Sequence, residues 1–172
     1  PWDDLEIVRG WDLAITDKQT SDYTCGALLG FQKDTDAIYI LDMKRARQAW
    51  AKMRQTVLGT SMSDRTAKPP VLRIAIEGVS GFEAIYQDVK QELLGDVQVV
   101  KKNPPKGGKL LRAQPWLNRL EAGHLHVVRA AWTKDFIDEL ENFPEGRHDD
   151  QFDAVNVAFE LFETPKPKLL IA

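Results

Sequence analysis

The sequence contains a single cysteine, Cys25, and no apolar run that approaches the roughly 20 residues needed to span a bilayer. One cysteine excludes a disulfide within the chain and agrees with a reducing compartment such as the cytosol. We therefore expect a protein that has no membrane partner and is not secreted. The chain also lacks a signal peptide and opens on Pro1 instead of Met, so we expect a fragment of a longer protein.

Residues that build structural zinc sites are scarce as well. The three histidines and one cysteine include no pair of ligands at the spacing of a structural zinc site. Cys25 lies in an apolar stretch and is expected to be a buried, unreactive thiol rather than a nucleophile. His124 and His126 are expected to be structural or surface groups. These absences disfavour zinc binding and cysteine chemistry.

The overall composition is that of an ordinary globular protein. The chain has 172 residues, of which 43% are hydrophobic and 28% are charged. This length allows one compact domain with a core, and this composition excludes a wholly disordered chain. We assign residues 1–163 to the domain and residues 164–172 to a C-terminal tail.

The net charge of −3 disfavours a protein that coats nucleic acid indiscriminately, but the charges are distributed unevenly. No acidic residue lies between Asp96 and Glu121, or between Asp42 and Asp64. Two basic segments in an acidic chain indicate a polyanion that docks at defined places, and solvated helix faces are the alternative. The first segment contains Lys101, Lys102, Lys106, Lys109, Arg112 and Arg119, and the second contains Lys44, Arg45, Arg47, Lys52 and Arg54.

Three stretches with strand propensity open the chain, at residues 5–15, 23–33 and 36–43. The short turn between the second and the third predicts a hairpin, so the three are expected to form an antiparallel meander. Residues 45–58 carry apolar side chains at helical spacing, which predicts a helix. Residues 59–70 are rich in Ser, Thr and Pro and are predicted to be a loop.

A nearly continuous apolar run at residues 71–77 predicts a buried central strand. Helices that follow the third and fourth strands imply right-handed crossovers between parallel neighbours. We therefore predict an α/β fold, in which a mixed sheet of three antiparallel strands followed by parallel strands has helices on both faces. The remaining predicted elements are helices at residues 81–94, 109–121, 133–142 and 148–162, strands at 97–100 and 125–128, and a flexible loop at 103–108.

Acidic residues lie at two of the predicted strands and at the start of the last helix. Asp12 is on the first strand and Glu77 ends the fourth, so their side chains meet if these strands are adjacent. Asp149, Asp150 and Asp153 place three carboxylates within five residues. A helix N-terminus offsets their repulsion by only roughly 0.3–1 kcal/mol per group. An all-oxygen cluster of this kind suits Mg²⁺ or Mn²⁺.

Each acid also has a simpler explanation when it is taken alone. Asp12 could accept hydrogen bonds from backbone amides at a strand end. Asp149 and Asp150 could cap the last helix. Glu77 could pair with a basic residue of its own neighbourhood. The candidates for that pairing are Arg73 and Lys90.

The spacing within residues 148–153 ranks the acids of the last helix. Asp150 and Asp153 lie one helical turn apart on one face, whereas Asp149 points about 100° away from Asp150. We therefore expect Asp150 to contribute most and Asp149 least. His148 is expected to cap the helix or to support a ligand, and direct metal ligation by this residue is the less favoured alternative.

Several segments resemble the nuclease domain of the large terminase subunit of tailed double-stranded DNA phages, in the RNase H-like superfamily that includes Holliday-junction resolvases. The resemblance covers residues 6–162 and implies an RNase H-like fold. Its most specific part is His148-Asp149-Asp150-Gln151-Phe152-Asp153-Ala154 with the apolar helix that follows. The other parts are Gly10-Trp11-Asp12-Leu13-Ala14 with Asp22-Tyr23-Thr24, Ile74-Ala75-Ile76-Glu77-Gly78, and Lys109-Leu110-Leu111-Arg112-Ala113.

The resemblance implies a metal-dependent endonuclease that cuts concatemeric viral double-stranded DNA during genome packaging. It places the catalytic acids at Asp12, Glu77 and Asp150, and it adds Asp153 and Asp149 as supporting metal ligands. Two Mg²⁺ or Mn²⁺ ions bound there would activate a water molecule on one side of a phosphate and stabilise the leaving oxygen on the other.

The family's large subunit also has an N-terminal ATPase motor. This chain contains no Gly-x-x-x-x-Gly-Lys-Ser/Thr motif, so we expect the motor to be absent from it. The implied partners are double-stranded DNA, the motor, the portal and the small terminase subunit, in the cytoplasm of an infected bacterial host. The basic residues within 101–119 are expected to hold DNA phosphates, with little reading of the bases.

Two other functions compete with this prediction. A Holliday-junction resolvase or another RNase H-like nuclease would have the same fold and the same metals. A non-catalytic RNase H-like module would bind protein or DNA without cutting. The acids at Asp12, Glu77 and Asp150 argue against the second of these.

Overall fold

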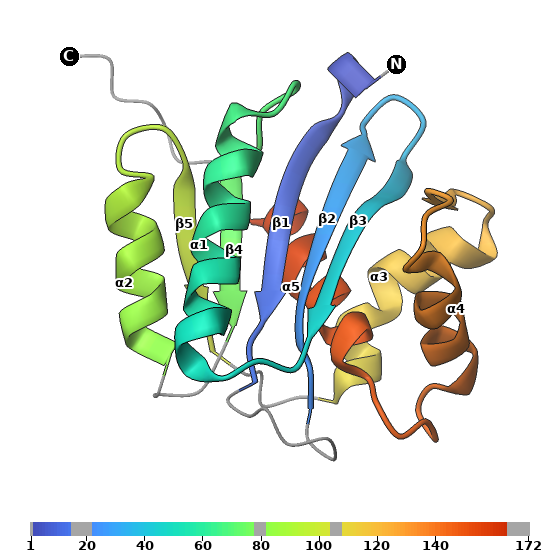
Figure 1. Cartoon of the computed structure of the whole chain (residues 1–172). Coiled ribbons are helices and arrows are strands. Elements are labelled where there is room, and N and C mark those ends of the chain that lie inside the picture. The colour runs from blue at the N-terminus through green and yellow to red at the C-terminus, as the bar shows by residue number, and fades with distance from the viewer. Residues whose placement is uncertain (1, 15–21, 78–81, 104–107, 165–172) are drawn as a thin grey trace.

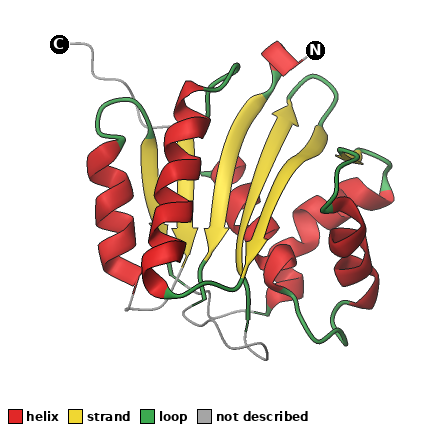
Figure 2. Ribbon diagram, viewed as in Figure 1, coloured by secondary structure: helices red, strands yellow, loops and turns green. Residues whose placement is uncertain are grey.

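The computed structural model describes residues 2–14, 22–77, 82–103 and 108–164. Most of the loop predicted at 103–108 lies outside these residues, and so does Lys106. Strands form one sheet with helices packed on both of its faces (Figures 1 and 2). The elements are η1 (Trp2–Asp4), β1 (Glu6–Asp12), β2 (Thr24–Gln32), β3 (Ala37–Ala46), α1 (Trp50–Thr66), β4 (Arg73–Glu77), α2 (Glu83–Glu92), β5 (Gln98–Lys102), α3 (Lys109–Glu121), β6 (Leu125–Val127), α4 (Thr133–Asn142) and α5 (Asp150–Glu163).

The described strands form a six-stranded sheet in the order β5-β4-β1-β2-β3-β6. Strands β1, β2 and β3 pair antiparallel, which confirms the predicted meander. Strand β4 pairs in parallel with β1 and with β5. The prediction that a crossover joins parallel neighbours is therefore right for β4 and β5 but wrong for β3 and β4, because β4 is added on the far side of β1.

Helix α1 differs from the helix predicted at residues 45–58. Strand β3 continues to Ala46, which still pairs with β2, so the helix begins only at Trp50. It then runs to Thr66, through most of the predicted loop. The extra turns are held by the buried Asp64, whose carboxylate accepts two hydrogen bonds from the guanidinium of Arg9 on β1. An unpaired buried Arg9 would be costly, so this ion pair stabilises helix where local composition favours a loop.

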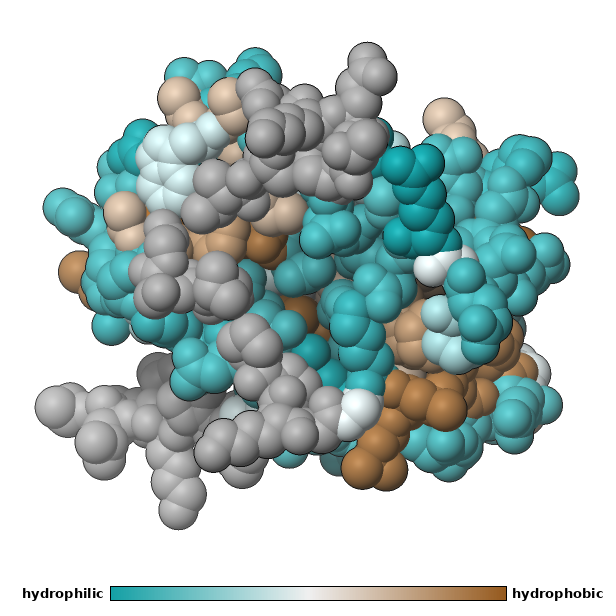
Figure 3. Space-filling model, turned by 90° about the horizontal axis from the view of Figure 1, so that it is seen from below, coloured by the Kyte–Doolittle hydropathy of each residue, from teal (hydrophilic) through white to brown (hydrophobic). Residues whose placement is uncertain are grey.

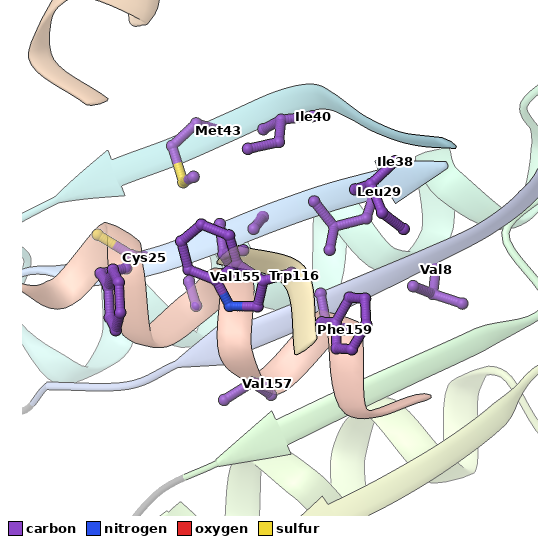
Figure 4. Close-up of a cluster of buried hydrophobic side chains, with 14 of the residues drawn as sticks. Val8, Cys25, Leu29, Ile38, Ile40, Met43, Trp116, Val155, Val157 and Phe159 are labelled. Carbon is purple, nitrogen blue, oxygen red and sulfur yellow. The ribbon is translucent and has the colours of Figure 1, made fainter. Parts of the chain in front are cut away.

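Two hydrophobic clusters cover the two faces of the sheet, because side chains alternate along each strand. One cluster joins Ile7 and Trp11 of β1 to α1 and α2. The other joins Val8 of β1 to α3, α4 and α5, and Figure 4 shows part of it between the sheet and α5. Helix α5 is buried on nearly every side and runs across the middle of the sheet. Among the described residues, no helix has the length and apolar character that a membrane span requires.

Gly10 allows α5 to lie directly against β1. A Cβ atom at this position would be 2.2 Å from the backbone nitrogen of Ala158 and 2.8 Å from the backbone oxygen of Ala154. No side chain fits in that space, so the contact is between strand backbone and helix backbone. This close approach fixes the height of α5 above the strand that carries Asp12.

Candidate metal centre

Strands β1 and β4 bring the first two predicted acids together. Their parallel register pairs Asp12 directly with Glu77. Asp12 has the same side-chain parity as Val8, and Glu77 has that of Ala75, and both of these apolar residues belong to the cluster beneath α5. Asp12 and Glu77 therefore lie side by side on the α5 face of the sheet, at the carboxyl ends of two parallel strands. The structure thus meets the condition on which the sequence analysis placed these two acids together, because β4 pairs with β1.

Helix α5 adds two more carboxylates to this group. Asp150 opens the helix and Asp153 follows one turn later, and only 5% and 8% of their surfaces are exposed. Oδ2 of Asp150 and Oδ1 of Asp153 are buried and have no hydrogen-bond partner among the described residues. Buried carboxylate oxygens without partners are costly, so these two atoms are available to a cation.

The pKa values follow from this crowding. Burial is the largest cause that raises the pKa of Asp12 well above its ordinary value, and repulsion from Asp153, Glu77 and Asp150 adds to it. Burial also raises the pKa of Asp150 to about 6, against the opposing effect of a hydrogen bond from the backbone amide of Tyr23. The pKa of Asp153 is raised by burial too, although Lys109 opposes the change. A divalent cation would relieve the repulsion that these shifts express.

Lys109 supplies a positive charge to the acids of α5. It is the first residue of α3, and its Nζ lies 2.6 Å from Oδ2 of Asp149 and 2.5 Å from Oδ2 of Asp153. Burial alone would lower the pKa of Lys109, but the two hydrogen bonds outweigh burial and raise it. Lys109 therefore stays charged and acts as a counterion for the acids.

Arg112, one turn further along α3, supplies the counterion for Glu77. Its guanidinium donates two hydrogen bonds to the Glu77 carboxylate, one of them at 3.1 Å, and a third to Glu160 of α5. Glu77 therefore does form an ion pair, but with Arg112 and not with Arg73 or Lys90 as the alternative proposed. Arg73 instead contacts Glu6, Gln98 and the backbone of Thr164.

Glu139 of α4, and not an aspartate of the helix itself, caps α5. Its Oε1 accepts hydrogen bonds from the backbone amides of Gln151 and Phe152, at 2.7 and 3.1 Å. Asp149 holds the N-cap position but makes no side-chain cap hydrogen bond. Glu139 thus already pairs with the free backbone N–H groups at the start of α5 and places a negative charge at the positive end of the helix dipole. The alternative that Asp149 and Asp150 are present only to cap the helix therefore fails.

A second group of possible ligands lies on the other side of Asp150. One ligand atom from each of Asp22, His148 and Asp150 falls within 4.8 Å of the others. Burial, followed by repulsion from Arg47, Arg45 and Arg147, lowers the pKa of His148.

The basic segment predicted to hold DNA does not form a surface of unpaired cations. Each of its described members has an acidic partner, including the counterions Lys109 and Arg112. Figure 3 views the end of the sheet where β1 and β4 finish, and the described surface there is mostly hydrophilic. DNA binding by this segment stays a prediction. The remaining pairs are Lys101 with Glu83, Lys102 with Glu160 and Arg119 with Asp36.

Comparison with known proteins identifies the family of the sequence. The sequence profile of the terminase RNaseH-like domain matches residues 9–161. The chain belongs to this family. The match includes Asp12, Glu77, Asp149, Asp150 and Asp153. A search of curated protein sequences finds no match to the chain.

Solved structures agree with the terminase RNaseH-like fold. The human cytomegalovirus terminase nuclease domain, soaked with Mn and bound to an inhibitor, superposes with a TM-score of 0.69 at 13% identity, over 94% of this chain and 86% of that one. The large terminase nuclease domain of P22 gives 0.68 at 11% identity, over 94% and 83%. The fowlpox virus resolvase in complex with Holliday-junction DNA gives 0.54 at 15% identity, over 91% and 97%. At these identities the likeness concerns the RNase H-like fold alone, and it confirms the predicted fold class.

Three features of this terminase RNaseH-like domain were missed by sequence reasoning. Lys109 and Arg112 were assigned to DNA rather than to the acids, and Glu139 was not singled out. The spacing of Lys109 and Arg112, three residues apart on one helix face, was the only local signal that both could point to one place. Glu139 has no such signal, because its partners lie on another helix.

Proposed function

We propose that this domain is a metal-dependent DNA endonuclease, the nuclease part of a large terminase subunit that cuts concatemeric viral double-stranded DNA during packaging. The observation that carries the proposal is the pairing of Asp12 with Glu77 beneath the start of α5, where Asp150 and Asp153 present buried oxygens without partners. Membership in the terminase RNaseH-like family supports it.

The donor set fits Mg²⁺ or Mn²⁺. Carboxylates from three separate elements converge, and hard divalent cations prefer oxygen ligands. We assign two ions to Asp12, Glu77, Asp150 and Asp153, with Asp149 at the margin. Once bound, the ions would lower the pKa of an attacking water molecule and stabilise the leaving oxygen. The Mn-soaked cytomegalovirus nuclease domain supports a divalent metal.

The protein residues contribute position and charge. Asp12 and Glu77 are held by the paired backbones of β1 and β4, so their separation is set by the sheet. Lys109 and Arg112 neutralise the acids in the metal-free protein, and on metal binding they become available to DNA phosphates at the same edge. Lys101, Lys102, Lys106 and Arg119 would extend this contact along the backbone.

The wider setting is part of the same proposal. The ATPase motor, the portal and the small terminase subunit would act with this domain, in the cytoplasm of an infected bacterium. We infer this setting from the resemblance of the sequence to large terminase subunits. Residues 1–163 would form the nuclease domain and residues 164–172 its tail.

Plasmid nicking tests the activity. Asp12→Asn and Asp150→Asn should each abolish Mn²⁺-dependent conversion of supercoiled DNA to the nicked form, while circular dichroism stays near wild-type. Asp96→Asn is a matched control, because Asp96 is exposed and forms its ion pair with Arg65, at the opposite end of the sheet. Cleavage retained in both site variants would refute the site assignment.

A junction resolvase is the second candidate, favoured by the fold shared with the fowlpox resolvase. Four-way junctions and linear duplexes of equal length separate the two functions. A packaging nuclease should cut both at similar rates, whereas a resolvase should cut the junction symmetrically and leave the duplex intact. A domain that binds Mn²⁺ and DNA but cuts neither substrate would be a non-catalytic module.

A further inference from the structure

The ring of His148 contacts Arg47, Asp150 and Tyr23. Its Nε2 lies 3.2 Å from a terminal nitrogen of Arg47, and its Nδ1 lies 3.5 Å from Oδ2 of Asp150. The ring meets Tyr23 edge-on, with centroids 5.2 Å apart. Arg45 and Arg47 in turn each place a guanidinium carbon 3.8 Å from the centroid of Tyr23. These contacts leave the imidazole little freedom to rotate.

The contact with Arg47 determines which nitrogen of His148 carries the proton. A guanidinium has only donors, so the nitrogen that faces it must present a lone pair. That nitrogen is Nε2. In a neutral ring the proton then sits on Nδ1, which faces Asp150. An imidazolium with both nitrogens protonated would turn an N–H group toward the guanidinium.

The same contact argues against a cation held by Asp22, His148 and Asp150, although their ligand atoms are close enough. A histidine that binds a metal usually donates its other N–H to a carboxylate or carbonyl. Here that position faces a donor.

We propose that His148 is a positioning residue, held by Arg47 as the Nδ1-protonated tautomer so that its N–H orients the Asp150 carboxylate. This inference rests on the proposed role of Asp150 as a metal ligand. The backbone amide of Tyr23 already donates to Asp150, so the two donors fix the plane of the carboxylate. The present separation of 3.5 Å would shorten to a hydrogen bond if a bound metal fixed the charge of the carboxylate, since catalytic contacts are often long in the unliganded state.

A tautomer measurement tests the arrangement without metal or DNA. Long-range ¹H–¹⁵N correlation spectra of the metal-free protein should show His148 protonated at Nδ1, with the resonance assigned by its loss in His148→Asn. Arg47→Met should shift the ring toward the Nε2-protonated form. An Nε2-protonated ring in the wild-type protein would overturn the inference and leave the proposed nuclease function untouched.

Mn²⁺ titration calorimetry tests the consequence for the metal. His148→Asn keeps an N–H donor near the Nδ1 position and should bind Mn²⁺ almost as tightly as wild-type, whereas His148→Leu should bind about 10-fold more weakly. Asp22→Asn should leave affinity unchanged. Equal losses in the Asn and Leu variants, or a 10-fold loss in Asp22→Asn, would make His148 a ligand and overturn the inference. Wild-type protein that binds no Mn²⁺ would instead overturn the proposed function. Melting temperatures confirm that each variant is folded.

Discussion

Asp150→Asn should make the metal-free protein more stable, although it removes a residue essential to the proposed function. Burial raises the pKa of Asp150 from 3.8 to about 6, so the folded protein holds this proton more tightly than the unfolded chain. The stability that the neutral carboxyl contributes is present below pH 3.8 and is lost as the pH rises through about 6. Above that pH the ionised carboxylate costs about 3 kcal/mol, because each pKa unit corresponds to about 1.4 kcal/mol.

Replacing the carboxylate with a neutral amide removes this cost. For a domain of this size, about 3 kcal/mol corresponds to a rise in melting temperature of about 6–12 °C at pH 7.5. Differential scanning calorimetry in EDTA measures it, and the gain should shrink toward zero near pH 4, where wild-type Asp150 is protonated. Asp96→Asn is the control and should change stability by less than about 0.5 kcal/mol. Destabilisation by Asp150→Asn at pH 7.5, or a gain that does not vary with pH, would refute the reasoning.

Three more predictions concern the supports of the site. Gly10→Ala should cost about 1–3 kcal/mol in chemical denaturation and weaken Mn²⁺ binding, because the new Cβ would lie 2.2 Å from the Ala158 nitrogen; unchanged stability would mean that α5 does not lie against β1. Asp64→Ala should cost about 3–5 kcal/mol in urea unfolding, because it leaves Arg9 buried with one acidic partner fewer, and a loss below 1 kcal/mol would contradict this. Lys109→Met should raise Mn²⁺ affinity in calorimetry and reduce cleavage at saturating metal, since its ammonium competes with the ion but later contacts phosphate; weaker Mn²⁺ binding would contradict its role as a competing counterion.

The contact of Asp12 with Glu77 could be predicted from the sequence only on the condition that the first and fourth strands are neighbours. The crossover pattern alone placed the fourth strand beside the third, whereas it pairs with the first. The extent of α1 could not be predicted. The Gly, Thr and Ser residues that follow position 58 have weak helix propensity. The interaction that favours helix there is the ion pair between Asp64 and Arg9. A local pattern contains no information about a partner 55 residues away.

The pairing of basic residues with the acids of the site could not be predicted from the sequence, for a related reason. A run of lysines and arginines without acids looks like a surface for a polyanion, yet Lys109 and Arg112 turn toward the carboxylates of β4 and α5. Net charge along the chain does not report charge in space, because α3 packs beside elements that are distant in sequence. The capping of α5 by Glu139 could not be predicted for the same reason, because Glu139 belongs to another helix.

The contact between β1 and α5 determines when a nascent chain could acquire the proposed activity. The first strand of the sheet and the last helix of the domain must meet before the four acids can share a cation, and both also belong to one hydrophobic cluster. Such a contact between chain ends forms late, because the intervening chain must be ordered first. A nascent or truncated chain without α5 therefore lacks Asp150 and Asp153 together with much of its core. If the proposed function is right, cutting of DNA would be restricted to chains that have been completed and folded.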